Sequence, residues 1–388
     1  MNGARALRIA YVNGSLDVGG AERQMMALAA HLPRDRFSVD FVLLNHRGAL
    51  APAAEAAGAK VRVLGWPRKQ GRLHVLRRLA TSARFPRVLR AGHYDIVDAW
   101  VFSSYAITTA TRPLHRIPVV MSGRRCLSAF KGQHGLFNRL LDVLARRWTD
   151  AIVANSEAVR ADVAEREHVA AQRVRVIYNS VEIPPAMPAS EREAIRMGWG
   201  FGPDDVVVGS VANYRPRKGL ETLLRAAAAL HPQVPGLRMV LVGEGPLRPV
   251  LERMISELGL TGVVVLHGRE PDARRLYGAF DVVAHASERE GLPNVVLEAA
   301  AAGRAIVATA AGGTPEVVLA GESGLIVPVG DEEGFERELL RLVGDPALRE
   351  RLGAAARERA ATVFGMDRFV AETAALYEEL AERKGVRR

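Results

Sequence analysis

Short apolar runs alternate with amphipathic, helix-like stretches along the whole chain. The runs are 7–13, 38–44, 60–64, 95–99, 117–121, 150–154 and 174–177 in the first half, and 206–211, 237–242, 263–267, 282–285, 305–308 and 324–327 in the second. Their continuous, β-branched character is typical of parallel strands buried on both faces. Because helical patterns such as 21–31, 157–167 and 220–230 separate them, we predict an α/β fold with two doubly wound, Rossmann-like sheets.

A proline-rich segment lies between the two sets of runs. The 388 residues suffice for two domains at about 100–200 residues each. Pro184, Pro185 and Pro188 lack the amide that helices and sheets require, so we place the interdomain linker there. The predicted domains are 1–183 and 184–366. An amphipathic helix near 367–384, within the terminal segment 367–388, is predicted to pack back across the domains.

The composition is that of a globular protein whose charge is unevenly distributed. Hydrophobic residues make up 48% and charged residues 25%, which is typical of a chain with a buried core. The net charge is +10; residues 1–183 contain 28 Lys and Arg against 14 Asp and Glu, whereas 184–388 contain 25 against 29. Such asymmetry favours contact of the first half with an anionic surface.

The start of the chain and its only cysteine bear on the compartment. The first predicted strand begins at Leu7 without the features of a secretory signal, and no apolar run approaches the ~18 residues that a membrane span needs. We therefore expect a cytoplasmic protein. Cys126 cannot form an internal disulfide, and we expect it to be a small buried residue in a reducing compartment.

The segment 287–299 contains two glutamates around a strand–turn–helix junction. Glu290 lies in the predicted turn and Glu298 about one turn into the predicted helix. Such a junction presents free backbone amides and the positive end of a helix dipole, which suit a phosphate. The two carboxylates can accept hydrogen bonds from hydroxyls on either side of it. Sugar and ribose rings offer such hydroxyls.

The segment 209–219 places three cations after the first strand of the second half. Arg215, Arg217 and Lys218 stand within four positions, before a predicted helix. Arg forms bidentate hydrogen bonds and Lys supplies a mobile charge, so the three can neutralise a diphosphate. We expect ligands in the cleft between the two sheets, at the carboxyl ends of their strands.

Glycines at other strand ends border the same predicted ligand site. Gly19 and Gly20 follow the first strand and let the backbone approach a ligand closely. Gly243, Gly268 and Arg269 end strands of the second sheet and are predicted to border the nucleotide base. The chain lacks the G-x-G-x-x-G fingerprint after its first strand, which disfavours a nicotinamide-dependent oxidoreductase.

Together these segments resemble glycosyltransferase family 4. The frame Ser-x-x-Glu-Gly-x-Pro-Asn-x-x-x-Glu-Ala over 287–299 matches the family signature, and Gly-Gly-Ala-Glu over 19–22 matches its glycine loop. The resemblance implies a GT-B fold, with two Rossmann-like domains facing a central cleft. It implies retaining transfer of a hexosyl-type sugar from a nucleotide diphosphate sugar, with a UDP-sugar favoured, to a glycan or lipid-linked acceptor. No metal or other cofactor is expected.

The family's functional residues carry over to matching positions. Glu290 corresponds to the glutamate that contacts the donor sugar, Glu298 to the ribose ligand, and Lys218 to the lysine of the diphosphate clamp. Arg215 is our choice for the clamp arginine, with Arg217 as the alternate. The predicted catalytic residues are thus Glu290, Arg215 and Lys218, and the predicted donor-binding residues are Gly19, Gly20, Arg217, Gly243, Gly268, Arg269, Gly291, Leu292, Pro293, Asn294 and Glu298.

The chain departs from the family near 98–104, where many members have a histidine close to the reacting sugar. Trp100 and Ser103 are predicted to line the acceptor side instead, and Arg124 and Arg125 to reach an anionic acceptor. An equally good interpretation is that these residues serve packing and solvation. The departure also keeps open a non-catalytic nucleotide-sugar-binding protein. A nucleotide-sugar epimerase of similar fold is a further alternative.

A basic stretch over 68–90 has two open interpretations. Its basic residues are Arg68, Lys69, Arg72, Arg77, Arg78, Arg84, Arg87 and Arg90, and it contains no acid. With its interleaved apolar residues it can lie on the anionic inner face of the cell membrane, at about 1 kcal/mol per basic residue. Alternatively it is an ordinary exposed helix whose apolar face joins the core. Nucleic acid is not an expected partner, because stacking aromatics and a nucleic-acid motif are missing.

Overall fold

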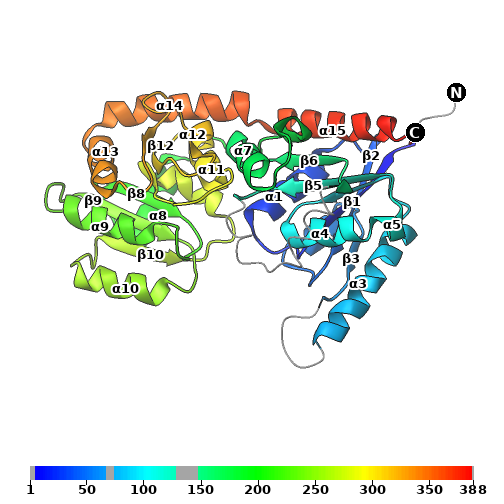
Figure 1. Ribbon diagram of the computed structural model, residues 1–388. Coiled ribbons are helices and arrows are strands. Elements are labelled where there is room, and N and C mark those ends of the chain that lie inside the picture. The colour runs from blue at the N-terminus through cyan, green and yellow to red at the C-terminus, as the bar shows by residue number, and fades with distance from the viewer. Residues whose placement is uncertain (1–4, 67–73, 128–146, 387–388) are drawn as a thin grey trace. The chain divides into compact units, whose positions relative to one another are not determined.

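The chain divides into two compact units, which we describe separately (Figure 1). The computed structural model describes residues 5–66, 74–127 and 147–386, with the backbone alone over 74–79. Unit 1 comprises Met1–Asn179 and Asp367–Arg388, and unit 2 comprises Ser180–Met366. The segment Pro184–Pro188, expected to be the linker, lies inside unit 2. Val181, just before this segment, forms an isolated bridge with Gly365, and Pro184 O accepts a hydrogen bond of 2.8 Å from Arg357; both partners belong to unit 2.

Unit 1 is built on a seven-stranded parallel sheet. Its strands are β1 (Leu7–Asn13), β2 (Phe37–Leu43), β3 (Val61–Val63), β4 (Ile96–Ala99), β5 (Val119–Arg124), β6 (Ala151–Ala154) and β7 (Val174–Val176). They lie in the order β3-β2-β1-β4-β5-β6-β7, and all the pairings are parallel. Every strand predicted in this half is present. β5 is the largest deviation, since it continues to Arg124 rather than ending at 121.

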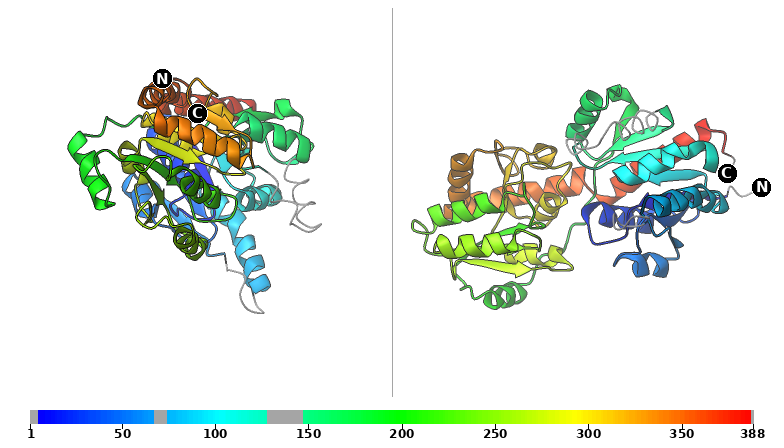
Figure 2. Two further views of the ribbon diagram at one scale, coloured as in Figure 1. Left: turned by 90° about the vertical axis from the view of Figure 1, so that its left-hand side faces the viewer. Right: turned by 60° about the horizontal axis from the view of Figure 1, so that its bottom comes forward.

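The helices of unit 1 lie on both faces of its sheet (Figure 1 and Figure 2). They are α1 (Gly20–His31), α2 (Ala51–Ala56), α3 (His74–Ala91), α4 (Phe102–Ala110), α5 (Arg112–His115), α7 (Glu157–Arg166), the 3-10 helix η2 (Ala171–Arg173) and α15 (Met366–Arg383). α7 begins as an N-capped helix, because the hydroxyl of Ser156 accepts a hydrogen bond of 3.1 Å from Val159 N.

The C-terminal helix α15 completes the core of unit 1. The hydroxyl of Tyr377 donates a hydrogen bond of 2.8 Å to Asp98 Oδ2 and lies 3.2 Å from the hydroxyl of Tyr11. All three side chains are buried. Asp98 belongs to β4 and Tyr11 to β1, so the helix is anchored to the centre of the sheet.

Unit 2 is built on a six-stranded parallel sheet. Its strands are β8 (Val206–Val211), β9 (Leu237–Val242), β10 (Val264–Gly268), β11 (Val282–His285), β12 (Ala305–Thr309) and β13 (Leu325–Val327), in the order β10-β9-β8-β11-β12-β13. Its helices are α8 (Ala189–Gly198), α9 (Leu220–Leu230), α10 (Arg248–Glu257), the 3-10 helix η3 (Ala273–Ala279), α11 (Asn294–Ala301), α12 (Thr314–Val317), α13 (Glu332–Gly344) and α14 (Pro346–Val363). The predicted doubly wound α/β class is confirmed for both units.

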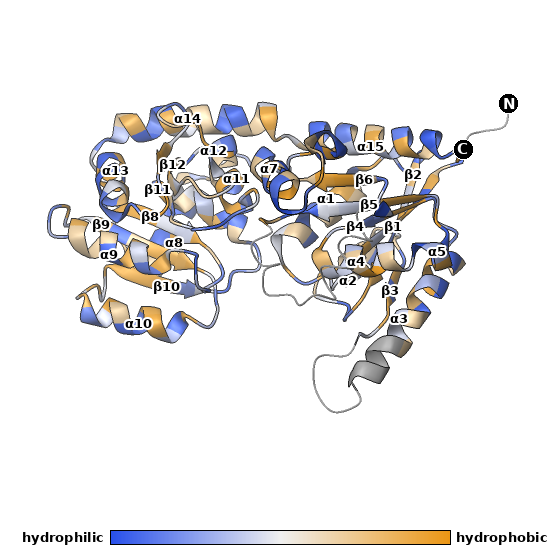
Figure 3. Ribbon diagram, in the orientation of Figure 1, coloured by the Kyte–Doolittle hydropathy of each residue, from blue (hydrophilic) through white to orange (hydrophobic). Residues whose placement is uncertain are grey.

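Each sheet is the centre of a hydrophobic core. The strands are coloured hydrophobic along much of their length in Figure 3, whereas α14 alternates between the two colours. In unit 2 the core combines strand residues such as Val208 and Leu241 with Leu223 and Leu224 of α9 and Phe335 of α13, all at most 1% exposed. Burying each such side chain stabilises the fold by about 1.5–3 kcal/mol. The continuous apolar runs of the sequence are therefore the buried strands.

In each sheet the strand order reverses at one point. This point lies between β1 and β4 in unit 1 and between β8 and β11 in unit 2. Loops that follow two such strands diverge and leave a crevice at the carboxyl ends, where ligands of open α/β sheets bind. In unit 2 these are the loops 212–219 and 286–293, which contain the two strongest motifs of the sequence.

The structure bears on two predictions, one for the basic stretch 68–90 and one for membrane-spanning helices. Arg84, Arg87 and Arg90 on α3 are exposed, whereas Phe85 and Leu89 are buried in the core. This part of the basic stretch is thus a helix with its apolar face on the core. Arg68, Lys69 and Arg72 and the side chains of Arg77 and Arg78 lie outside the described residues. Of the helices in the described ranges, none combines the length and hydropathy needed to cross a bilayer.

The expectation for Cys126 is wrong. Its side chain is exposed rather than buried. The reason is its position: it lies two residues beyond the end of β5 at Arg124, past the buried part of the strand.

Candidate functional site

The loop after β8 is joined to the loop after β11 through the backbone. The carbonyl oxygen of Arg217 accepts hydrogen bonds from Glu288 N at 2.9 Å and from the hydroxyl of Ser287 at 3.1 Å. Gly219 packs so closely that a Cβ would overlap the carbonyl of Ala286, and its φ of 67° also favours glycine. The two motifs, far apart in the sequence, therefore form one structural element.

This junction places the side chain of Lys218 beside that of Glu290. Lys218 Nζ lies 2.7 Å from Glu290 Oε1, and both side chains are partly buried, at 30% and 14% exposed. Arg217, directly before the lysine, has a φ of 71°, a conformation that non-glycine residues seldom adopt. Such backbone strain concentrates at functional sites, where the surrounding structure maintains it.

A histidine completes the surroundings of Glu290. His285 is the last residue of β11 and is 3% exposed, and its Nε2 lies 3.3 Å from Glu290 Oε1. The ring is close enough for an ion pair when protonated, although it is not aligned for a hydrogen bond. Burial by itself raises the pKa of Glu290, but His285 and Lys218 outweigh it and lower that pKa to about 2. Glu290 is therefore a carboxylate at neutral pH.

A third loop, after β12, holds the backbone of Glu290 in place. Gly312 has a φ of 53°, and a Cβ there would overlap the carbonyl oxygen of Glu290. Gly313 N donates a hydrogen bond of 2.9 Å to Gly291 O. The position of the glutamate thus depends on a glycine that the signature 287–299 does not include.

The start of α11 follows directly. Asn294 is the first helical residue, and Pro293 at the N-cap position has no side chain that caps the helix. Gly291, Leu292 and Pro293 are buried, which fixes the approach to the helix. The amides at a helix N-terminus favour an anion. They lie at the end of the same loop as Glu290.

The second glutamate of the signature has its own partner. Glu298 Oε2 accepts a hydrogen bond of 3.1 Å from the hydroxyl of Tyr277, which belongs to η3. Tyr277 is buried. The tyrosine positions one carboxylate oxygen of Glu298 on the first turns of α11.

Other predicted donor-binding residues lie at neighbouring strand ends. Gly243 N donates a hydrogen bond of 2.8 Å to Gly268 O, so the loops after β9 and β10 are adjacent. Arg215, Arg217 and Arg269 are exposed. Within the described part of the chain, the structure records no polar partner for these three side chains. They remain candidates for a charged ligand.

In unit 1 the glycine loop contacts its own helix. Asn13 Nδ2 donates a hydrogen bond of 2.9 Å to Glu22 Oε1, and the carboxylate of Glu22 occupies the space that a Cβ on Gly19 would need. Gly20 is exposed and begins α1. The close approach at Gly19 is therefore made by Glu22 of the same motif.

Two of the predicted acceptor-side residues lie together. The guanidinium of Arg125 lies 4.0 Å from the ring centroid of Trp100, a cation–π geometry, and donates a hydrogen bond of 2.9 Å to Asn179 Oδ1. Burial lowers the pKa of Arg125 to about 10, against the opposing charge of Asp98, so the side chain stays cationic at neutral pH. Trp100 is buried, and Ser103 on α4 is half-buried.

Arg124 has a different role from the one predicted. Its Nε and Nη2 donate hydrogen bonds of 2.9 and 3.0 Å to the two carboxylate oxygens of Glu167, and both side chains are almost fully buried. Its guanidinium also lies 3.8 Å from the ring centroid of Tyr105. Because β5 includes Arg124, its side chain points into the fold and is occupied there. We therefore omit it from the acceptor side.

Two residues of this region were not predicted from the sequence. His285 and Tyr277 each contact a glutamate of the signature. The position of His285 at the last residue of the strand before the signature is a signal that was present in the sequence. Tyr277 lies 21 residues before Glu298 and offers no local signal.

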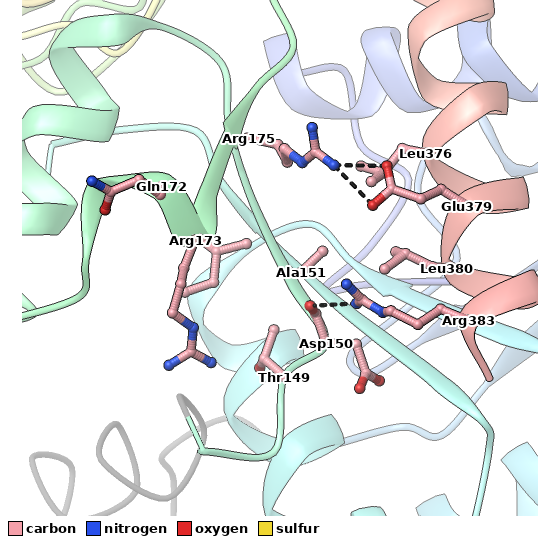
Figure 4. A pocket seen from close by; sticks show the side chains of 11 residues that line it. Thr149, Asp150, Ala151, Gln172, Arg173, Arg175, Leu376, Glu379, Leu380 and Arg383 are labelled. Carbon is pink, nitrogen blue, oxygen red and sulfur yellow. Dashed lines mark hydrogen bonds and ion pairs between the residues drawn. The ribbon is translucent and has the colours of Figure 1, made fainter.

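A pocket in unit 1 lies apart from these groups. It measures about 250 Å³ and is lined by the amino ends of β6 and β7 and by α15. Figure 4 shows Arg175 paired with Glu379 and Arg383 reaching the backbone of Asp150. The pocket is at the opposite end of the strands from Trp100.

Among the described residues no group of three or more His, Cys, Asp or Glu is arranged to hold a metal ion.

Comparison with known proteins identifies the family. Residues 18–183 match the model described as Glycosyltransferase Family 4, and residues 191–359 match that described as Glycosyl transferases group 1. The D-inositol 3-phosphate glycosyltransferase of Saccharomonospora viridis is 30% identical over 373 residues, covering 89% of this chain and 86% of that protein. The putative glycosyltransferase EpsD of Bacillus subtilis is 29% identical over 314 residues, covering 77% and 80%.

A solved structure agrees with the fold. Anabaena Alr3699/HepE in complex with UDP-glucose superimposes with a TM-score of 0.84 at 23% identity, covering 96% of this chain and 100% of that one. At this identity the likeness concerns the fold alone. The chain therefore belongs to the group 1 glycosyltransferases of glycosyltransferase family 4, and it is a sugar-transferring enzyme with a two-domain, Rossmann-like GT-B fold.

Proposed function

We propose that the enzyme transfers a hexosyl-type sugar, with retention of its anomeric configuration, from a nucleotide diphosphate sugar to a glycan or lipid-linked acceptor. The observation that carries the proposal is the Lys218–Glu290 pair at the switch point of unit 2, in the loop that leads to the N-terminus of α11. A UDP-sugar is the favoured donor. Alr3699/HepE, which shares the fold, is described in complexes with UDP and with UDP-glucose.

The departing diphosphate is stabilised by fixed positive charge. An ammonium group has three donors, and Lys218 uses one of them on Glu290, so two remain for phosphate oxygens. Arg215 is exposed nearby in the same loop, and the amides of α11 add the positive end of a helix dipole. Preorganised donors of this kind stabilise charge as it develops in the transition state. In this proposal they do so without a resident metal ion.

The two glutamates bind rings at either end of the diphosphate. Glu290 is ionised at neutral pH, because its pKa is lowered to about 2, so its free oxygen accepts hydrogen bonds from hydroxyls of the donor sugar. Glu298 Oε2 is held by Tyr277, which orients the carboxylate toward a ribose. The strand-end residues Gly243, Gly268 and Arg269 border the base.

The reaction proceeds on one face of the sugar. The bond between the anomeric carbon and the phosphate oxygen breaks and leaves an oxocarbenium-like centre. The acceptor hydroxyl forms the new bond on the same face, and its proton passes to the departing phosphate. Glu290 stays ionised throughout and stabilises the ring through its hydroxyls.

The acceptor side is proposed for unit 1. Trp100 offers an aromatic surface, and Arg125 stacked on it offers a cation. Ser103 is half-buried on the neighbouring helix. These groups suit an acceptor that carries a sugar ring and an anionic group. We place the reaction in the cytoplasm, with any membrane contact made by the basic stretch 68–90.

The test is a transfer assay with a panel of UDP- and GDP-sugars, with and without a saccharide acceptor, in the presence of EDTA. We expect transfer from one nucleotide class, and an NMR spectrum of the product that shows the anomeric configuration of the donor. Lys218→Ala and Glu290→Ala should each abolish transfer, whereas Arg253→Gln, an exposed change on α10, should not. Full activity in both variants would contradict the proposal. Conversion of the donor sugar without acceptor would indicate an epimerase instead.

A further inference from the structure

A groove of about 710 Å³ crosses unit 2 at the amino ends of its strands. Asp281 and Ala305, which line it, immediately precede or begin β11 and β12, whereas Lys218 and Glu290 lie beyond the carboxyl ends of the sheet. The groove is thus at the opposite edge from the proposed donor site. Its volume falls in the range of small-molecule sites, which is about 300–1,000 Å³.

The lining is strongly basic. Six arginines line the groove against three acids, Glu191, Asp281 and Glu350. Glu191 and Glu350 are exposed at its rim. Asp281 is already saturated: its Oδ2 accepts from Arg196 Nη2 at 2.6 Å and from Val207 N at 2.7 Å, and its Oδ1 accepts from Arg192. Arg274, exposed on the lining, is paired with Asp272 and Glu182. The other lining arginines have Asp281 as their partly buried carboxylate, and it is already engaged.

The arginines are held close together by backbone carbonyls. Arg304 donates from Nε to Ala302 O and from Nη1 to Phe280 O, at 3.0 and 3.1 Å. Arg357 donates from its two terminal nitrogens to Ala301 O and Pro184 O, each at 2.8 Å. These bonds fix the position of both groups but do not neutralise their charge.

The arginines of the groove repel one another because their positive charges lie close together. Burial lowers the pKa of Arg304, and the charges of Arg192, Arg196 and Arg357 lower it further, against the opposing charge of Asp281. Like charges held near one another in a partly buried place are stabilised by an anion that enters between them. Nη2 of Arg304 has no hydrogen-bond acceptor among the described residues. Arg275, exposed on the groove wall, likewise has no side-chain partner in that part of the chain.

We propose that this groove, lined by Arg192, Arg275, Arg304 and Arg357, is a second ligand site that binds a small molecule bearing more than one phosphate group. Guanidinium groups bind phosphate through paired, charge-assisted hydrogen bonds. The recess favours a small ligand over an extended surface, because Arg192, Arg304 and Arg357 are half-buried within it. The site is separate from the donor site and goes beyond the sugar transfer.

The experiment is a calorimetric titration with tripolyphosphate at constant ionic strength. Arg192→Gln with Arg275→Gln removes two cations without touching the carbonyl-bound arginines, and Asp281 keeps its bonds to Arg196 and Val207. We expect this double variant to lose about tenfold or more in affinity, in line with the loss of two charge-assisted contacts. Arg253→Gln, the matched exposed control, should bind like the wild type.

A fourth protein separates the groove from the donor site. The Lys218→Ala variant should keep the wild-type affinity for tripolyphosphate. If Lys218→Ala loses this affinity and the double variant keeps it, tripolyphosphate binds at the donor site and the proposal is overturned. Absence of wild-type binding, or binding to anionic vesicles alone, would also overturn it. Should the double variant fail to fold, Arg275→Glu alone, at an exposed position, tests the same prediction.

Discussion

Lys218 and Glu290 form a hydrogen-bonded ion pair of 2.7 Å, although 72 positions separate them in the sequence. The pair exists because the loops after β8 and β11 share backbone hydrogen bonds through Arg217. A cation and an anion of the proposed donor site thus hold each other in place before any ligand binds. Preorganisation of this kind lowers the cost of ordering the site on binding.

The pair should show energetic coupling. In a double-mutant cycle with Lys218→Met and Glu290→Gln, we expect a coupling free energy of about 1–2 kcal/mol, because each single change leaves a partly buried charge without its partner. Urea unfolding of the four proteins measures it. Arg225 and Glu332, paired at 44% and 42% exposure, serve as the control cycle and should couple by less than about 1 kcal/mol. Equal coupling in the two cycles would contradict the preorganised site.

Stability should fall in acid through Glu290. Its pKa is lowered from 4.5 to about 2 in the folded protein, so its stabilisation is present above pH 4.5 and is lost as the pH falls through about 2. The contribution at neutral pH is about 3 kcal/mol. Unfolding free energies measured between these pH values should decline less steeply in Glu290→Gln. Glu288→Gln, an exposed neighbour, should keep the wild-type slope.

Gly312 should be more sensitive to substitution than other glycines of positive φ. Gly312→Ala adds a Cβ that overlaps the carbonyl of Glu290, whereas Gly321→Ala, at a φ of 77°, meets nothing within 4 Å. Both changes incur the left-handed strain of about 1 kcal/mol. Only Gly312→Ala should also reduce sugar transfer, since it displaces Glu290. Thermal unfolding and sugar-transfer assays of the two variants measure their stability and activity. Equal transfer activity in both would contradict the role of Gly312 in positioning Glu290.

Tyr377→Phe should loosen the C-terminal helix. The change removes the donor to the buried Asp98, which costs about 1–3 kcal/mol in unfolding free energy. Glu379→Gln on the same helix breaks an exposed pair with Arg175, at 47% and 54% exposure, and should cost less than about 1 kcal/mol. Urea unfolding distinguishes them. A negligible effect of Tyr377→Phe would show that the hydrogen bond to Asp98 does not stabilise the packing of α15.

Arg124→Met should be among the most destabilising single changes. It leaves Glu167 charged and buried, which costs about 3–5 kcal/mol. Arg160→Met, which breaks a pair with Glu157 at 41% and 45% exposure, is the surface control. If Arg124→Met unfolded like the wild type but used acceptor poorly, the original acceptor-side prediction would be restored.

The strands were predictable because they are buried on both faces. β8, β9 and β11 have the predicted bounds. Each is an apolar run between two turns, so the first and last residues of the strand can be identified in the sequence. The helix 220–230 was likewise found as predicted, because Gly219 marks its start. These features depend on local sequence alone.

What the sequence did not reveal depends on distant partners. The buried role of Arg124 requires Glu167, 43 positions away, and the unit boundary at Ser180 reflects contacts between distant segments, such as the bridge between Val181 and Gly365. No local pattern distinguishes an arginine at a strand end that reaches a ligand from one that turns inward. The contact of His285 with Glu290 likewise depends on how the loop folds back.

The return of α15 to unit 1 has a consequence for synthesis. Residues 180–366 form a contiguous unit, and all of them are translated before Tyr377. The first 179 residues therefore lack α15 until unit 2 has been translated, and Tyr377 of this helix contacts Asp98 and Tyr11. Although its N-terminal part emerges first, unit 1 is therefore the later unit to have all the residues of its core, and a chain truncated near residue 366 would contain the whole of unit 2 but only the N-terminal part of unit 1.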